Sequence, residues 1–148
     1  MSIFNRKKQE NVIIIGCGFL GVKIAELLHK QYDSVSIIDI NVQAFSKLSR
    51  SSDFILIKGD ASDIDVLENA GIKTADIVLI TTKDDNTNIM IAEIAKEYYK
   101  VHKVITYVKD TSKEFAYKQI GIDVISPISL LIDEIRNILG DESEGAGI

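Results

Sequence analysis

Three glycines and one acidic residue near the start of the chain have the types and the spacing that nucleotide binding requires. Gly16, Gly18 and Gly21 follow an apolar run, and Asp39 ends the next apolar run, 18 residues after Gly21. A buried strand, a glycine turn and the first turn of a helix, in that order, form a phosphate-binding loop. A carboxylate at Asp39 can accept hydrogen bonds from both ribose hydroxyls of an adenosine. The combination therefore predicts a nucleotide site.

Each residue of the glycine turn has a separate part in this prediction. Gly16 allows the tight turn, Gly18 leaves no Cβ where a pyrophosphate approaches the backbone, and Gly21 lets the helix pack closely on the strand. Phe19 and Leu20 lie in the first turn of that helix, whose free N–H groups and partial positive charge face the phosphates.

Ligands of doubly wound sheets bind at the carboxyl ends of the strands, so the residues after each apolar run are further candidates. Ile40 and Asn41 follow the second run, and Asp60 and Ala61 follow the third. Asp60 can accept a hydrogen bond from the exocyclic amine of adenine, or it can cap the helix expected over residues 62–70. Both interpretations stay open, and they are compatible.

Thr81, Thr82 and Asn86 follow the fourth apolar run. These side chains can line the second half of a dinucleotide site, or they can simply begin the next helix. We favour the first interpretation and expect all three to belong to the site.

Short apolar runs alternate with helical patterns along the whole chain. Continuous apolarity, rather than alternation of apolar and polar residues, is typical of parallel strands covered on both faces. We therefore predict an α/β fold, a Rossmann-type doubly wound six-stranded parallel sheet in a three-layer sandwich, with the strand order 3-2-1-4-5-6. The runs are residues 12–15, 35–38, 54–57, 77–80, 104–108 and 124–125.

Length and charge limit the possible classes of protein. With 148 residues, the chain is expected to form one domain over residues 11–140, between a flexible tail of residues 1–10 and a disordered tail of residues 141–148. The net charge of −5 argues against nucleic acid as a partner, because nucleic-acid binding needs a basic face. No apolar run approaches the roughly 20 residues that span a bilayer, so direct membrane insertion is not expected.

Residues of the types used in catalysis are not placed for chemistry. His29 and His102 lie away from the strand ends, and the tyrosine–lysine spacing of Tyr99 and Lys103 straddles a helix end. Cys17 is a small residue within the glycine turn, and no spacing of histidine, cysteine and acidic residues suggests a metal site. The sixth strand and one helix end the pattern, which leaves no segment to hold a substrate. We therefore expect no catalytic residues and no enzyme.

The last helix is apolar on more than one side. Its stripe is expected to face the core, and Leu130 and Leu131 lie beside that stripe, so apolar side chains point in more than one direction and need a second surface to cover them. We expect that surface to be another copy of the chain, and the alternative is a deep groove within the same chain. The stripe consists of Leu131, Ile132, Ile135, Ile138 and Leu139.

These motifs together resemble the N-terminal domain of TrkA-type potassium-uptake regulators, the KTN or RCK domain. The similarity spans about residues 11–139, in a standalone form without the C-terminal regulatory domain of most full-length members. The matching stretches are residues 15–21, 35–39, 58–61, 75–80 with 84–88, and 121–127.

The resemblance implies a cytoplasmic regulatory subunit that gates a membrane potassium transporter or channel. Such a subunit is peripheral to the inner face of the cell membrane through this partner, and it forms a homo-oligomer, either a dimer or a larger ring. The ligands of the family are NAD(H) or an adenine nucleotide (ATP, ADP or AMP). The alternative is the cofactor-binding half of a small NAD-dependent oxidoreductase whose catalytic part is another chain.

The family's site residues carry over by position. Gly16, Gly18 and Gly21 match the phosphate loop, Asp39 matches the ribose acid, and Asp60 with Ala61 matches the adenine turn. The chain departs from the family pattern at Phe19 and at Tyr107, where many members carry basic residues. This departure argues against tight binding of a polyphosphate.

Overall fold

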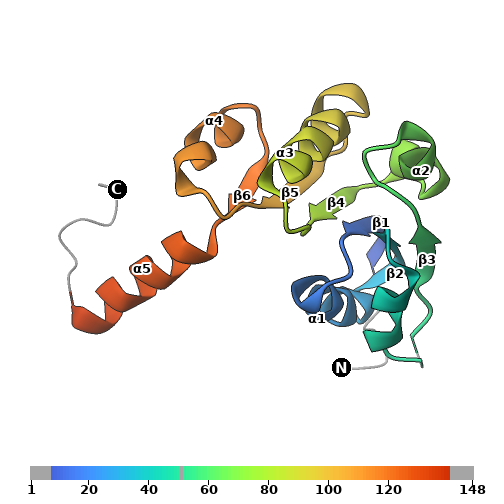
Figure 1. The fold of residues 1–148 in the computed structure, drawn as a ribbon, viewed down its shortest axis with the longest axis horizontal. Coiled ribbons are helices and arrows are strands. Elements are labelled where there is room, and N and C mark those ends of the chain that lie inside the picture. Colours follow the sequence, from blue (N-terminus) through green and yellow to red (C-terminus); the bar gives the residue numbers. More distant parts are fainter. Residues whose placement is uncertain (1–7, 51, 141–148) are drawn as a thin grey trace.

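The computed structural model describes residues 8–50 and 52–140. Its strands form one all-parallel sheet in the order β3-β2-β1-β4-β5-β6, which confirms the predicted fold class and strand order (Figure 1). The strands are β1 (Lys8–Ile15), β2 (Tyr32–Asp39), β3 (Ile55–Lys58), β4 (Ile77–Ile80), β5 (Lys103–Tyr107) and β6 (Asp123–Ile125).

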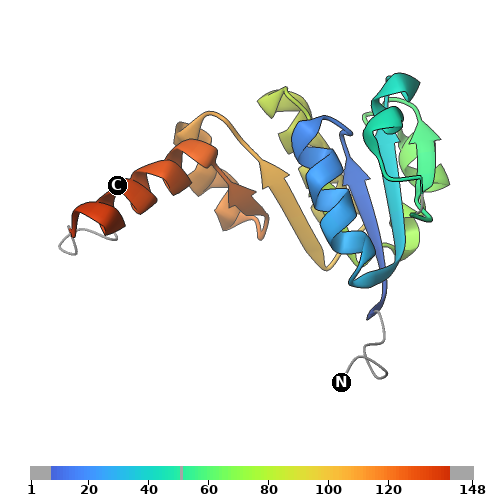
Figure 2. The same cartoon turned by 90° about the horizontal axis from the view of Figure 1, so that it is seen from below.

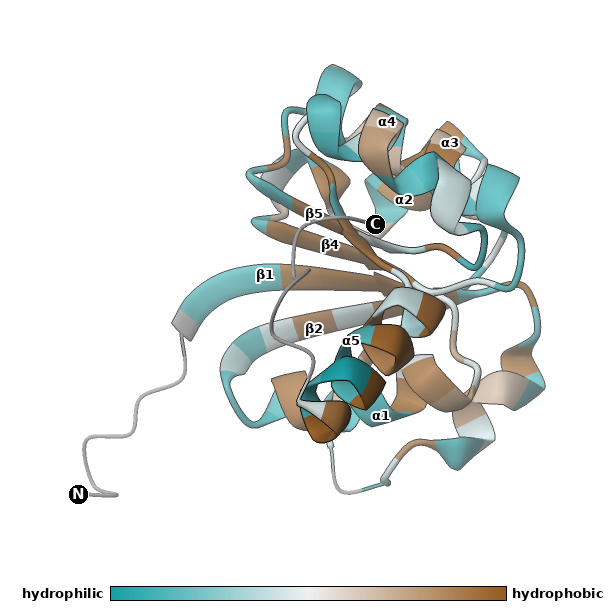
Figure 3. Ribbon diagram, turned by 90° about the vertical axis from the view of Figure 1, so that its left-hand side faces the viewer, coloured by the Kyte–Doolittle hydropathy of each residue, from teal (hydrophilic) through white to brown (hydrophobic). Residues whose placement is uncertain are grey.

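Helices cover both faces of the sheet, so the sheet is the middle of three layers (Figures 2 and 3). The helix α1 and the short helix η2 pack on one face, and α2, α3, η4 and α4 lie on the other. The α-helices are α1 (Phe19–His29), α2 (Ile64–Asn69), α3 (Asp85–Glu93), α4 (Glu114–Gln119) and α5 (Pro127–Leu139). The shorter helices are η2 (Val42–Lys47), η3 (Ile72–Thr74), η4 (Ile94–Tyr98) and η5 (Thr111–Lys113).

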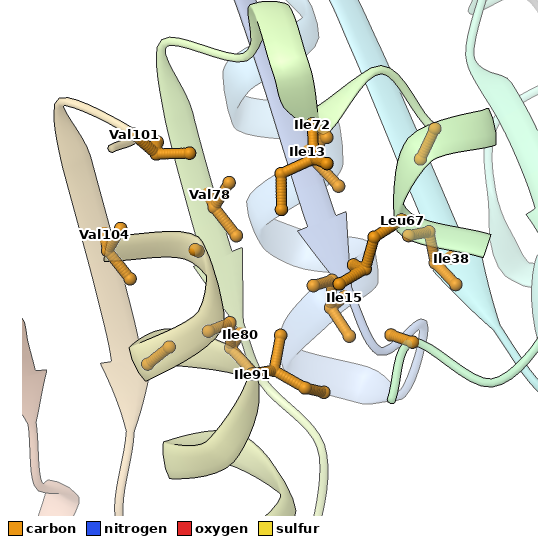
Figure 4. Close-up of a cluster of buried hydrophobic side chains, with 14 of the residues drawn as sticks. Ile13, Ile15, Ile38, Leu67, Ile72, Val78, Ile80, Ile91, Val101 and Val104 are labelled. Carbon is orange, nitrogen blue, oxygen red and sulfur yellow. The ribbon is translucent and has the colours of Figure 1, made fainter. Parts of the chain in front are cut away.

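The central strand β1 shows why the apolar runs are continuous. Val12 and Ile14 face the α1 side, whereas Ile13 and Ile15 face the side of α2 and α3. Because successive side chains of a strand point to opposite faces, a strand buried on both faces needs apolar residues at every position. Figure 4 shows the cluster on the α2–α3 side, in which Ile13 and Ile15 are almost completely buried.

The sheet begins earlier than expected. β1 starts at Lys8, which pairs with Tyr32 of β2 before the register shifts. Residues 8–10 therefore belong to a strand and not to the tail that we expected over residues 1–10, because backbone pairing does not require an apolar side chain. Residues 1–7 and the tail expected over residues 141–148 lie outside the described residues.

The expected inward stripe of the last helix is wrong. α5 extends away from the sheet (Figures 1 and 2). None of its residues is buried, and Leu131, Ile135 and Ile138 are 63%, 55% and 75% exposed. Only Ser126 connects β6 to α5, which is shorter than most connections between a strand and a helix. The helix therefore leaves the edge of the sheet instead of folding back over it.

Across residues 8–50 and 52–140, the structure contains no helix with the length and apolarity needed to cross a membrane.

Candidate functional site

A cleft of about 720 Å³ opens where β1, β2, β3 and β4 end. These carboxyl ends meet at the point where the strand order reverses, the usual ligand position in a doubly wound sheet. Most of the sequence-predicted residues line it: Gly16, Gly18, Asp39, Ile40, Asn41, Asp60, Ala61, Thr81 and Thr82. Further lining residues are Ile15, Cys17, Ile38, Gln43, Ala44, Ser46, Lys47, Gly59, Lys83, Asp84, Thr87 and Ile91.

The glycine turn has the geometry that its spacing predicts. Gly16 has a φ of +102°, which favours glycine, and its N–H donates to the Ile38 carbonyl at 2.9 Å. A Cβ on Gly21 would lie 1.9 Å from the Gly16 carbonyl oxygen, so only glycine allows this close packing of α1 on the turn. A Cβ on Gly18 would meet no atom within 4 Å. Gly18 therefore leaves open space where a phosphate can approach the backbone.

The helix α1 presents an uncapped N-terminus to this turn. Gly18 is its N-cap and provides no side-chain hydrogen bond. By contrast, Asp63, Asp84 and Ser126 cap α2, α3 and α5 with their side chains. The first N–H groups of a helix have no partner within the helix and carry partial positive charge. At α1 they are available to an anionic group beside Gly18.

Asp39 joins the end of β2 to the glycine turn. Its Oδ2 accepts a hydrogen bond from the Cys17 N–H at 2.7 Å, and its Oδ1 accepts one from the Asn41 N–H at 2.8 Å. A carboxylate has about four lone-pair sites, so each oxygen can still accept a further hydrogen bond. The two backbone contacts hold the carboxylate at the cleft in a fixed orientation.

Asp60 does not cap the following helix, because α2 begins at Ile64 and its cap is Asp63. The Asp60 Oδ1 instead accepts from the hydroxyl of Ser62 at 2.7 Å and from its N–H at 2.9 Å. Both hydrogen bonds lower the pKa of Asp60, and the one from the Ser62 hydroxyl has the larger effect. Asp60 is therefore ionised at neutral pH, and its second oxygen remains available at the cleft.

The end of β4 forms the opposite wall of the cleft. The Thr81 hydroxyl donates to the carbonyls of Ile15 and Gly16, at 3.2 and 3.1 Å, and so ties β4 to the glycine turn. The Thr82 hydroxyl is hydrogen-bonded to the side-chain oxygen of Asn88. Both threonines thus line the cleft and also hold its wall together.

Four sequence-predicted residues are not among those that line the cleft. The Phe19 side chain is 78% exposed at the start of α1, with the Lys23 ammonium 5.7 Å from its ring centroid. Gly21 is buried in the contact of α1 with the turn, and Leu20 borders a separate apolar groove. The Asn86 side-chain oxygen accepts from the Lys113 ammonium at 3.1 Å.

Sequence reasoning missed the two basic residues of the cleft, Lys47 and Lys83. Lys47 ends η2, and Lys83 lies in the loop between β4 and α3. Neither position belongs to the glycine motif, and a single lysine in a loop carries no distinguishing pattern. A usable signal for Lys83 was its place directly after Thr82, at a strand end where ligands bind.

The Cys17 thiol is buried beneath the cleft and donates to the Ala44 carbonyl at 3.6 Å. Burial, followed by the Asp39 carboxylate, raises the pKa of this thiol to about 11, and the Lys47 ammonium partly opposes the increase. A thiol protonated at neutral pH is a weak nucleophile.

The cleft combines free helix N–H groups, oriented carboxylates and two ammonium groups. These groups together can bind an anionic group, the diol of a sugar and a nucleobase. Within the part of the chain that the structure describes, no three or more histidine, cysteine and acidic side chains are grouped to hold a metal ion.

The TrkA-N domain family model matches residues 12–127 of the chain. The chain is 29% identical over 135 residues to the Trk system potassium uptake protein TrkA of Streptomyces coelicolor, covering 90% of this chain and 60% of that protein. It is 33% identical over 117 residues to a TrkA homolog of Methanothermobacter thermautotrophicus, covering 78% and 54%. The chain thus spans about half to three fifths of the length of these relatives.

Solved structures show the same fold. The TrkA-N domain of the inner membrane protein ybaL from Escherichia coli superposes with a TM-score of 0.78 at 14% identity, covering 90% of this chain and 99% of that one. The GsuK channel bound to NAD superposes with a TM-score of 0.70 at 26% identity, and the match covers 90% of this chain and 23% of that one. The AMP-bound Kef CTD of Shewanella denitrificans superposes with a TM-score of 0.67 at 27% identity, and the match covers 89% of this chain and 83% of that one.

Proposed function

Because this chain belongs to the TrkA-N domain family, we propose that it is a nucleotide-binding regulatory subunit of a membrane potassium transporter or channel. The observation that carries this proposal is the cleft, in which the uncapped N-terminus of α1 and the Asp39 carboxylate lie at the same end of the sheet. Relatives named as potassium uptake proteins support the role in transport.

The ligand in this proposal is NAD(H) or an adenine nucleotide. Asp39 accepts from the ribose hydroxyls, and Asp60 accepts from the adenine amine beside Ala61. The phosphates lie over Gly18 and the first N–H groups of α1, between Lys47 and Lys83. A 2′-phosphate would meet the Asp39 carboxylate, so NADP(H) binds much more weakly than NAD(H).

The proposed regulation also needs contact between copies of the chain. An apolar groove lies beside α1 on the same face of the sheet, over β4, β5 and β6, where no helix within residues 8–50 and 52–140 covers it. Its lining residues are Leu20, Ile24, Leu79, Ile80, Thr81, Ile105, Tyr107 and Ile125. In the proposed dimer, the exposed apolar side of α5 from a second copy covers this groove, and a reciprocal exchange gives two-fold symmetry. Larger rings can be built from such dimers.

The proposed location is the cytoplasm, at the inner face of the cell membrane and held there by the transporter or channel. A nucleotide that binds one assembly state more tightly than another biases the bound pore between its states. Typical coupling of this kind is about 1–3 kcal/mol.

Two experiments test the proposal. Mass spectrometry of the nucleotide released from purified protein identifies the ligand, and calorimetry with the same compound must give one site per chain. Deletion of the gene in its host should slow growth at limiting potassium and leave growth at high potassium unchanged. Unchanged growth at limiting potassium refutes the transport role.

A further inference from the structure

We propose that Asn88 is a positioning residue that couples the nucleotide cleft to the apolar groove and to the start of α5. Its side chain joins Thr82, which lines the cleft, to Tyr107, which lines the groove. This inference rests on the proposed function, because it needs a nucleotide in the cleft.

The Asn88 side chain lies fully buried on α3 and bonds to both segments. Its amide nitrogen donates to the Thr82 carbonyl at 2.9 Å and to the Tyr107 carbonyl at 3.0 Å. Its amide oxygen accepts from the Thr82 hydroxyl. A primary amide carries two donors on one nitrogen, so Asn88 can bridge two carbonyls that cannot bond to each other.

The bridge lies just beyond the point where backbone pairing of β4 with β5 ends. The last paired residues are Ile80 and Thr106. Thr82 and Tyr107 follow them, and there the buried amide replaces the ladder as the connection between the two strand ends. Asn88 therefore sets the position of one strand end relative to the other.

The end of β5 leads directly to α5. Tyr107 pairs with Ile125 of β6, and the next N–H, that of Val108, donates to the Ile125 carbonyl at 3.0 Å. Ile125 borders the groove and precedes Ser126, the N-cap of α5. A change in the position of Tyr107 is therefore felt by the groove and by the residue from which α5 starts.

Burial explains why the bridge transmits a movement of the cleft wall. In the proposed site the phosphates lie beside Lys83, the residue next to Thr82. If Thr82 moved without Tyr107, a buried donor of Asn88 would lose its acceptor, which costs free energy. Tyr107 therefore follows Thr82, and a nucleotide that immobilises the cleft wall also immobilises the end of β5.

Hydrogen-exchange mass spectrometry of the full chain, with and without saturating AMP or NAD⁺, tests this inference. In the wild type the nucleotide should slow exchange at the glycine turn and also at residues 107–110 and 126–130. A wild type protected only at the cleft overturns the inference. If neither compound binds, the proposed function fails, and the inference fails with it.

The variant Asn88→Leu fills a similar space without donors, and Asn88→Ser is a second variant with a smaller side chain. In either folded variant, slowing at the glycine turn should remain, whereas slowing at residues 107–110 and 126–130 should disappear. A merely structural role would raise exchange equally with and without nucleotide and keep the difference between the two states. Persistence of that difference at the distant segments overturns the inference.

Thr106 offers a matched control, because it is a fully buried polar residue of β5 whose hydroxyl donates to the same Tyr107 carbonyl at 3.4 Å. Thr106→Val removes this bond and keeps the shape of the side chain, but it leaves the bridge to Thr82 in place. The nucleotide effect at residues 107–110 and 126–130 should persist. Its loss in this variant would show that any weakening of β5 abolishes it, and would overturn the role of Asn88.

Nucleotide binding by an α5 variant gives an independent test, because coupling between two sites is reciprocal. Leu131→Glu with Ile135→Glu should change the dissociation constant for AMP or NAD⁺ about fivefold or more, the lower end of typical coupling. The same change in the Asn88→Leu protein should alter this constant less than about twofold, as expected for uncoupled sites. Equal effects with and without the Asn88 amide overturn the inference.

Discussion

The Asp39 carboxylate combines a structural contact with the proposed contact to ribose. Replacing it with alanine should weaken binding of AMP and NAD⁺ by about 1–3 kcal/mol, the range for hydrogen bonds to a charged group. Calorimetry measures the loss, and Asp33→Ala, an exposed acidic position on the same strand, is the control. Because Asp39 also accepts from the Cys17 N–H, thermal unfolding is measured on both variants. Wild-type affinity in a folded Asp39→Ala protein would contradict the assignment.

Two glycines of the same turn should respond in opposite ways to alanine. Gly21→Ala places a Cβ 1.9 Å from the Gly16 carbonyl oxygen and should cost about 1–3 kcal/mol of stability or more. Gly18→Ala meets no atom within 4 Å and has a φ of −78° that alanine adopts, so its stability should stay near wild type. Its methyl group occupies the approach of the phosphate, so nucleotide binding should fall about tenfold or more. Urea unfolding and calorimetry separate the two effects, and equal destabilisation by both variants would contradict them.

The buried Cys17 thiol predicts a specific dependence of stability on pH. Its pKa rises from 9.0 to about 11 on folding, through burial first and the Asp39 carboxylate second. Between these values the folded chain keeps the proton that the unfolded chain loses. The stability that the protonated Cys17 thiol contributes is therefore complete below the pKa of the unfolded state. It is lost as the pH rises through the pKa of the folded state. Denaturant unfolding across this window should show a steeper decline for wild type than for Cys17→Ser. Parallel curves would contradict the prediction.

Among the elements, α5 is an amphipathic helix whose apolar side is not buried within a single chain. Its apolar side chains are exposed, so charged replacements should not disturb the folded monomer. The double variant Leu131→Glu and Ile135→Glu should shift the protein from dimer or larger ring to monomer at tens of micromolar, because it removes the apolar surface proposed to enter the groove. Light scattering measures the mass.

The matched control for α5 is the double variant Asp133→Ala and Arg136→Ala, which changes charged side chains of the same helix. It should keep the assembly of the wild type. A wild-type monomer at the same concentration, with and without nucleotide, would refute the assembly proposal.

For the whole molecule, a regulator should bind its nucleotide without consuming it. We expect no sustained change in absorbance at 340 nm when the purified chain is mixed with NADH and a panel of carbonyl compounds. The reason is that the cleft combines binding groups with no histidine among its lining residues. Steady turnover, abolished by Asp39→Ala, would favour the NAD-dependent oxidoreductase half instead.

The strand order and the end of the sheet that carries the cleft were predictable from the chain because local constraints determine them. A turn such as the one at Gly16 requires a left-handed backbone, and an apolar run such as residues 12–15 must be buried on both faces. Once six strand–helix units are recognised, few topologies remain. Gly16, Gly18, Asp39 and Asp60 could therefore be placed at one cleft without knowledge of any long-range contact.

The rest depended on which surfaces meet in space. An amphipathic helix specifies its apolar side but not what covers it, so the outward course of α5 followed from the short connection at Ser126. Lys47 reaches the cleft from η2, which lies beyond the strand ends, and no spacing in the chain predicts that it does. The contact between the segments after β4 and β5 depends on the Asp85 carboxylate, which accepts from N–H groups 24 and 25 positions away. Such contacts form only after the sheet has aligned the strand ends, because loop residues carry no periodic pattern of their own.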